Sequence, residues 1–65
     1  MAKDYYRQVI ERLRSAGFQF VGQAKGSHEK WRNDQTARLV IVPRNLKSRH
    51  TANAILKSAG LEKAF

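Results

Sequence analysis

The first apolar residues of the chain recur at intervals of three and four, the spacing of an α-helix with one buried face. They are Tyr6, Val9, Ile10 and Leu13. Asp4 is a residue type favoured at helix N-caps, and Gly17 can adopt the left-handed conformation that ends many helices. The pattern therefore predicts a helix over residues 4–16 with Asp4 as its N-cap.

Three strand-like segments come next. They are residues 18–24, residues 28–33 and residues 39–42, the last closed by Pro43. The first two begin with alternating apolar and polar residues, and the third is an apolar run rich in β-branched side chains. Residues 25–27 and 33–35 are polar and turn-forming. Strands joined by such short turns predict an antiparallel meander.

A second helical pattern follows the strands. Its apolar stripe is Ala52, Ile55, Leu56 and Ala59. This stripe predicts a helix over residues 51–59 that stops at Gly60, after a basic connection over residues 44–50. Leu61 and Phe65 are expected to fold back onto the core. The resulting αβββα order predicts an α+β fold, with a three-stranded antiparallel sheet and two helices on one face. The opposite face would be left to solvent or to a ligand.

The chain has 65 residues and no cysteine. A chain of this size buries only about 60% of the surface that its unfolded form exposes. We therefore expect one domain over residues 1–65 with a thin core, stabilised by packing, by helix caps or by a partner protein. Without cysteine it has neither a disulfide nor a thiolate metal site. No apolar run approaches the roughly 20 residues that span a membrane, and no signal-peptide pattern precedes the first helix. We expect a soluble, cytoplasmic protein.

The charge of the chain is the property that says most about its binding partner. Thirteen Lys and Arg residues stand against five Asp and Glu residues, which gives a formal net charge of +8 and a pI near 10.7. The basic residues are spread along the chain and do not form a tail, so they favour a polyanionic partner such as a nucleic acid. The alternative is a charge that serves only solubility. An anionic membrane is disfavoured because neither helix has a strong apolar face with bulky interfacial aromatic residues.

The second strand separates two kinds of side chain. Alternation over residues 28–33 places His28, Lys30 and Arg32 on one face and Trp31 on the other. An aromatic residue at this spacing in a small domain usually belongs to the core. Base stacking is the competing interpretation of Trp31.

His28 is the main candidate for chemistry. It follows Gly26 and Ser27 at the start of the second strand, and basic residues surround it. An imidazole can take or donate a proton near neutral pH. In RNA cleavage without a metal, the 2′-hydroxyl attacks its own phosphorus, which requires proton transfer and positive charge at the phosphate. A histidine amid cations supplies both, although an isolated surface histidine is more often structural or incidental.

The neighbours of His28 have supporting roles in this hypothesis. Lys25, Lys30 and Arg32 would hold the phosphate. Gly26 can adopt positive φ and allows a phosphate to approach the backbone, or it is an ordinary hairpin glycine. Ser27 would orient His28 or simply fill the turn.

Further basic residues precede the second helix. Arg44, Lys47 and Arg49 would follow an RNA backbone, or they form a solvated charged loop. His50 is a second candidate for proton transfer, against the simpler interpretation of a solvent-facing residue near the helix N-terminus. Two histidines without cysteine make no zinc site, and the carboxylates are too few and too scattered for magnesium. We predict no metal and no small-molecule cofactor.

Several of these segments together resemble the HicA toxin family, the small RNA-cleaving partners in bacterial HicA–HicB toxin–antitoxin pairs. The matching segments are Ala16-Gly17-Phe18, Lys25-Gly26-Ser27-His28 at the opening of a strand, Val42-Pro43, and Thr51 followed by Ile55–Leu61. They occur in family order over residues 5–65. Gly-Ser-His alone is a weak pattern, but the spaced Gly-Phe and Ala-Gly-Leu segments make the combination fairly specific.

The resemblance implies a fold similar to double-stranded RNA-binding domains and ribosome-independent cleavage of mRNA, with His28 catalytic and growth arrest as the outcome. A HicB-type antitoxin would bind the protein and cover His28. One position departs from the family pattern: many members have a histidine two residues after the proline, and this chain has Asn45 there. His50 and Lys47 are the nearest substitutes, but the family pattern assigns them no such role.

Three hypotheses from different classes remain. The first is a metal-independent endoribonuclease toxin in which His28 is the general acid or base. The second is a non-catalytic module that binds double-stranded RNA and does not need His28. A basic protein–protein adaptor is a third, which predicts no affinity for RNA.

Overall fold

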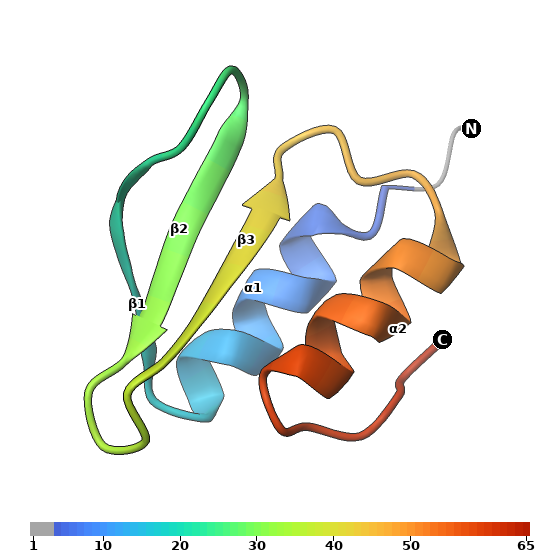
Figure 1. The fold of residues 1–65 in the computed structure, drawn as a ribbon. Coiled ribbons are helices and arrows are strands. Elements are labelled where there is room, and N and C mark those ends of the chain that lie inside the picture. Colours follow the sequence, from blue (N-terminus) through green and yellow to red (C-terminus); the bar gives the residue numbers. More distant parts are fainter. Residues whose placement is uncertain (1–3) are drawn as a thin grey trace.

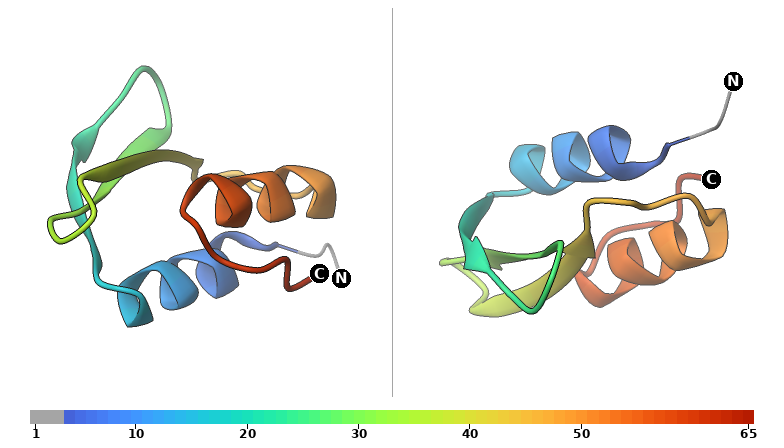
Figure 2. Two further views of the ribbon diagram at one scale, coloured as in Figure 1. Left: turned by 60° about the horizontal axis from the view of Figure 1, so that its bottom comes forward. Right: turned by 90° about the horizontal axis from the view of Figure 1, so that it is seen from above.

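The computed structural model describes residues 4–65 and contains two helices and three strands (Figure 1). In chain order they are α1 (Tyr6–Ser15), β1 (Phe18–Gln23), β2 (His28–Asn33), β3 (Arg38–Pro43) and α2 (Arg49–Ser58). The predicted αβββα order is confirmed. Both helices lie on the same side of the sheet, as the two rotated views make plain (Figure 2).

The N-terminus of α1 differs from the prediction. The helix begins at Tyr6, and Tyr5 occupies the N-cap position without a side-chain cap. The Asp4 carboxylate instead accepts a hydrogen bond from the Tyr6 N–H at 3.0 Å, two residues away. Tyr5 is held by its own N–H, which donates to the Leu46 carbonyl at 2.8 Å. This tertiary hydrogen bond sets the entry of the chain, and the helix starts two residues later than predicted. At its other end, Gly17 has φ +99° and terminates α1 as predicted.

The sheet is an antiparallel meander with β2 in the centre. The register pairs His28 with Pro43 and Trp31 with Val40 across β2 and β3. On the other side, Phe18 pairs with Asn33, and a bulge interrupts the β1–β2 register between Phe20 and Gly22. Because β2 is central, its period-two alternation defines an inner face toward the helices and an outer face toward solvent.

The core lies between the sheet and the two helices. Its buried apolar members come from every element and from the β3–α2 connection: Val9, Ile10, Leu13, Phe18, Trp31, Val40, Val42, Leu46, Ala52, Ile55, Leu56 and Ala59. Trp31 is only 2% exposed, with the Phe20 ring edge-on at 5.9 Å and the Arg14 guanidinium 5.2 Å from its centroid. Trp31 is therefore a core residue, and the base-stacking interpretation is wrong.

The helix α2 begins earlier than predicted. Ser48 is its N-cap, and the Ser48 hydroxyl accepts a hydrogen bond from the Thr51 N–H at 3.3 Å. Arg49 and His50 therefore belong to the first helical turn and not to the preceding connection, because a serine cap allows the helix to start directly after it.

Residues after α2 fold back as predicted. Leu61 and Phe65 pack against the core, and the Phe65 ring meets Tyr5 edge-on at 4.9 Å. Asn53 holds this segment: its amide nitrogen donates to the Phe65 carbonyl at 2.9 Å, and its oxygen accepts from the N–H groups of Ala64 and Phe65. Within residues 4–65, neither helix has the length and apolar character needed to cross a membrane.

Candidate functional site

The β1–β2 turn brings the predicted catalytic histidine to the surface. Gly26 takes a left-handed conformation with φ +66°, which lets the chain reverse over Lys25–Ser27. The Ala24 N–H donates to the His28 carbonyl at 2.8 Å, and the His28 N–H donates to the Lys25 carbonyl at 3.3 Å. These hydrogen bonds close the hairpin, so His28 is the first residue of β2 and its side chain is exposed.

One nitrogen of the His28 ring is held by the turn. Nδ1 lies 3.1 Å from the Lys25 carbonyl oxygen. A carbonyl can only accept a hydrogen bond, so Nδ1 must carry the proton in this arrangement. In the neutral ring, Nε2 is then the basic nitrogen. The turn therefore orients His28 with Nε2 available to accept a proton, and to donate one when the ring is charged.

Two further predicted residues share the outer face of β2 with His28. Lys30 and Arg32 are exposed at alternate positions, whereas Glu29, Trp31 and Asn33 are buried on the inner face. The Arg32 Nε lies 3.6 Å from an Asp34 carboxylate oxygen, and both side chains are largely exposed. This weak surface ion pair leaves Arg32 free to exchange Asp34 for a phosphate.

A buried carboxylate that was not among the predicted site residues lies directly behind this face. Glu29 is only 7% exposed. Its Oε1 accepts hydrogen bonds from the Tyr6 hydroxyl at 2.7 Å and the Trp31 indole N–H at 3.1 Å, and its Oε2 lies 3.6 Å from the Arg44 Nε. Burial raises the pKa of Tyr6 above its usual value, and the hydrogen bond to Glu29 acts in the same direction. The network joins α1, β2 and the end of β3.

The signal for Glu29 was present in the alternation. A strand that turns His28, Lys30 and Arg32 outward must turn Glu29 inward with Trp31. A carboxylate on a buried face requires hydrogen-bond donors. That reasoning identifies Glu29 as a buried polar residue, although it does not identify Tyr6 and Arg44 as its partners.

The remaining predicted residues lie in the connection from β3 to α2. The Arg44 N–H donates to the Ser27 carbonyl at 3.1 Å, so this connection meets the β1–β2 turn at the same end of the sheet (Figure 1). The Arg44 side chain leans toward Glu29 and so toward the helix side. Lys47 and Arg49 are exposed around the N-terminus of α2, whose first turn contains no acidic residue.

The structure thus divides the predicted site into three adjoining groups. Lys25–His28 and Arg44 meet at one end of the sheet. Lys30 and Arg32 extend from His28 along the outer face. The third group, Lys47 and Arg49, lies around the N-terminus of α2. Asn45, at the position of the family histidine, is exposed beside Arg44, and His50 is exposed in the first turn of α2. Across residues 4–65, no cluster of three or more His, Asp or Glu side chains could hold a metal ion.

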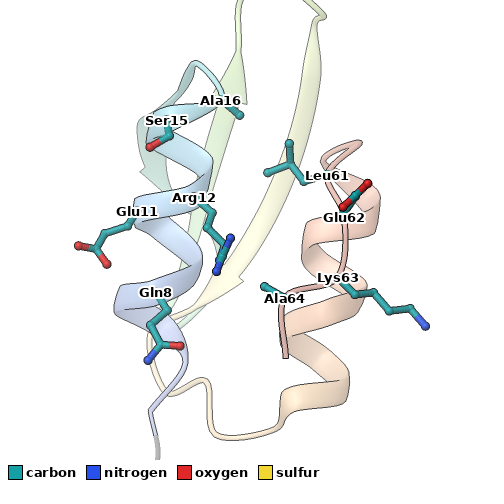
Figure 3. A pocket seen from close by; sticks show the side chains of 9 residues that line it. All are labelled: Gln8, Glu11, Arg12, Ser15, Ala16, Leu61, Glu62, Lys63 and Ala64. Atoms are coloured by element: carbon teal, nitrogen blue, oxygen red, sulfur yellow. The ribbon is translucent and has the colours of Figure 1, made fainter.

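An open cavity of about 730 Å³ lies elsewhere, between α1 and the segment after α2 (Figure 3). Its lining residues are Gln8, Glu11, Arg12, Ser15, Ala16, Leu61, Glu62, Lys63 and Ala64. None of them is a predicted site residue. The candidate site is therefore an exposed turn and strand face, not a cleft.

These features define a class of protein: a small, basic α+β domain with an open three-stranded sheet, similar in fold to double-stranded RNA-binding domains. Residues 6–61 match the family model described as HicA toxin of bacterial toxin-antitoxin. The chain belongs to the HicA toxin family, and it is the toxin component of a toxin–antitoxin system, which implies a cognate antitoxin. No curated protein and no solved structure matched the chain.

Proposed function

We propose that this toxin is a metal-independent endoribonuclease that cleaves mRNA without the ribosome, with His28 as the catalytic residue. The observation that carries the proposal is the geometry of His28: it is exposed, its Nδ1 is held 3.1 Å from the Lys25 carbonyl, and its Nε2 is available for proton transfer. Cleavage of mRNA in the cytoplasm would arrest translation and growth, and a HicB-type antitoxin that covers His28 would prevent it.

The reaction uses a nucleophile that RNA already contains. Nε2 of neutral His28 takes the proton of a 2′-hydroxyl while the 2′-oxygen attacks the adjacent phosphorus. The bond from phosphorus to the 5′-oxygen of the next nucleotide breaks, and that oxygen takes a proton from water and leaves as a hydroxyl. The hydroxide formed takes the proton from His28 and restores the neutral imidazole. The products are a 2′,3′-cyclic phosphate and a free 5′-hydroxyl. Proton transfer of this kind contributes about 10²–10⁴-fold to a rate.

Positive charge supports the same step. Lys25, Lys30 and Arg32 would neutralise the phosphate as charge develops on its oxygens. Gly26 and Ser27 shape the turn that holds His28. Arg44, Lys47 and Arg49 would follow the RNA backbone away from the scissile bond, and counterion release makes such binding depend on salt.

The test is cleavage of purified mRNA in EDTA by the wild-type protein, by His28→Ala and by His50→Ala, which removes the second candidate for proton transfer. We expect His28→Ala to lose at least about 100-fold in cleavage rate while it retains the wild-type affinity for RNA. With about four to six phosphate contacts, the logarithm of the RNA-binding constant should fall with the logarithm of the salt concentration with a slope of roughly −3 to −5. This slope should be the same for the wild-type protein and for His28→Ala. Cleavage by His28→Ala at the wild-type rate would refute the catalytic assignment.

The fold favours one alternative, a non-catalytic module that binds double-stranded RNA. It predicts that the wild-type protein leaves RNA intact in the same assay while it binds duplexes. A protein–protein adaptor predicts neither cleavage nor salt-dependent RNA binding.

A further inference from the structure

The strand β3 is an open edge of the sheet. It pairs with β2 on one side only, and β1 occupies the other edge. The Arg44 N–H donates to the Ser27 carbonyl, which lies directly before β2, and backbone N–H groups alternate in direction along a strand. The N–H groups of Val42 and Val40 therefore point toward β2, whereas those of Ile41 and Leu39 point away from it. No backbone hydrogen bond from a loop or helix within residues 4–65 reaches these outward groups. Such an edge can accept an added strand.

The same edge exposes apolar side chains. Leu39 is 53% exposed and Ile41 is 41% exposed, although both lie in the apolar run that predicted a strand. They face outward, where Leu39 pairs with Arg32 and Ile41 pairs with Lys30. Leu39 and Ile41 also form one wall of a groove of about 220 Å³ between β3 and α2, and the residues of α2 that line it include Ala54, Ile55 and Ser58. An apolar row therefore adjoins the basic row of the outer face.

Charge decides what kind of partner fits. In the strands that form this face, the one carboxylate is Glu29, which is buried on the inner side. A second copy of this chain would oppose one net charge of +8 with another. RNA would satisfy Lys30 and Arg32 but would offer nothing apolar to Leu39 and Ile41. An acidic protein strand satisfies the cations, the apolar row and the open backbone groups together.

We propose that the cognate antitoxin adds an acidic strand with alternating apolar residues to the open edge of β3, anchored on Leu39 and Ile41. Carboxylates of the same partner lie over Lys30 and Arg32. The added strand lies beyond β3, so the partner closes access to His28 by also extending across the outer face past Pro43, which pairs with His28. The docking surface is inferred from the geometry of the sheet, whereas the inhibition of cleavage by the bound antitoxin rests on the proposed nuclease function.

The test uses the full chain and the protein encoded by the reading frame adjacent to its gene. The double variant Leu39→Thr/Ile41→Thr places threonine, a β-branched residue that strands favour, at two exposed strand positions, so the fold should persist. We expect a loss of about 100-fold in affinity for that antitoxin, roughly tenfold for each anchor, with RNA cleavage within about twofold of wild type. The matched control is Val21→Thr, which alters a residue of equal exposure on β1 and should leave antitoxin affinity unchanged.

Hydrogen exchange gives a second measurement that does not depend on the variant. The amides of Leu39 and Ile41 should become protected in the complex. Unchanged antitoxin affinity of the double variant, or unprotected amides in a saturated complex, would overturn the proposal. The proposal would also be overturned if the double variant lost RNA binding or self-association but kept its affinity for the antitoxin. If the wild-type chain cleaves no RNA but the double variant still loses the antitoxin, the docking surface stands and the nuclease function fails.

Discussion

The hydrogen bond between Tyr6 and Glu29 joins α1 to the central strand, and its removal tests whether the buried network stabilises the fold. Tyr6→Phe keeps the ring and deletes the hydroxyl that donates to Glu29 at 2.7 Å. Hydrogen bonds to charged groups contribute about 1.5–3 kcal/mol, and Tyr6 is only partly buried. We therefore expect a loss of about 1–2 kcal/mol. A chain of this length has a total stability of about 3–10 kcal/mol, so Tm should fall by about 4–15 °C.

A double-mutant cycle isolates the interaction from other effects of each change. Tyr6→Phe, Glu29→Gln and the double variant are unfolded with urea, and their free energies of unfolding are compared. We expect a coupling energy of about 1 kcal/mol or more. The matched control is Tyr5→Phe, because Tyr5 packs through its ring against Phe65, and this change should cost less than about 0.5 kcal/mol. A coupling energy below about 0.5 kcal/mol would show that the network adds no stability of its own.

The pH dependence provides an independent test of the same contact. The pKa of Tyr6 is raised in the folded state by burial and by the hydrogen bond to Glu29. An unfolded tyrosine loses its proton near pH 10, whereas folded Tyr6 keeps it to higher pH. The resulting stabilisation is complete below about pH 10 and is lost as the pH rises through the raised pKa. The stability difference between wild type and Tyr6→Phe should therefore shrink from about pH 9 to about pH 11. A constant difference over this interval would contradict the assignment.

Two further changes test how the segment after α2 is held. Asn53→Ala removes three hydrogen bonds to Ala64 and Phe65, so we expect a loss of about 1–3 kcal/mol and faster hydrogen exchange of those two amides. Asn45→Ala, at an exposed position, is the control, and equal exchange in both variants would refute the role of Asn53. Gly60→Ala places a Cβ in a left-handed conformation at φ +81° and 3.2 Å from the Arg38 guanidinium carbon. We expect a cost of about 1–2 kcal/mol from the backbone plus the displacement of Arg38, which donates to the Ser58 carbonyl at 3.0 Å. Gly26→Ala, which meets open space at φ +66°, should cost less in thermal unfolding, and an equal cost would show that Arg38 does not matter.

Periodicity determined much of this protein before any tertiary contact was considered. The three-and-four spacing from Tyr6 to Leu13 predicts a helix whose buried residues are Val9, Ile10 and Leu13. Alternation in β2 separates His28, which is exposed, from Trp31, which is buried. These predictions succeed because backbone geometry alone determines which side chains share a face.

The position of the candidate histidine was equally predictable, but its orientation was not. His28 directly follows a glycine-containing turn, so its place at the start of a strand follows from local sequence. The hydrogen bond from Nδ1 to the Lys25 carbonyl depends on how that turn closes. Helix boundaries were missed for a similar reason, since the Leu46 carbonyl and the Ser48 hydroxyl set them through particular hydrogen bonds.

Only the tertiary structure decided which apolar residues are exposed and which charged residue is buried. Leu39 and Ile41 resemble core residues in the sequence but are exposed, because the helices cover one face of the sheet and β3 lies at its edge. Glu29 resembles a surface residue but is buried, because Tyr6, 23 positions earlier, and Trp31 supply donors to its carboxylate. Local sequence determines which face a side chain occupies. What covers that face depends on elements distant in the chain, and their packing determines whether the face is a core, a site or a docking surface.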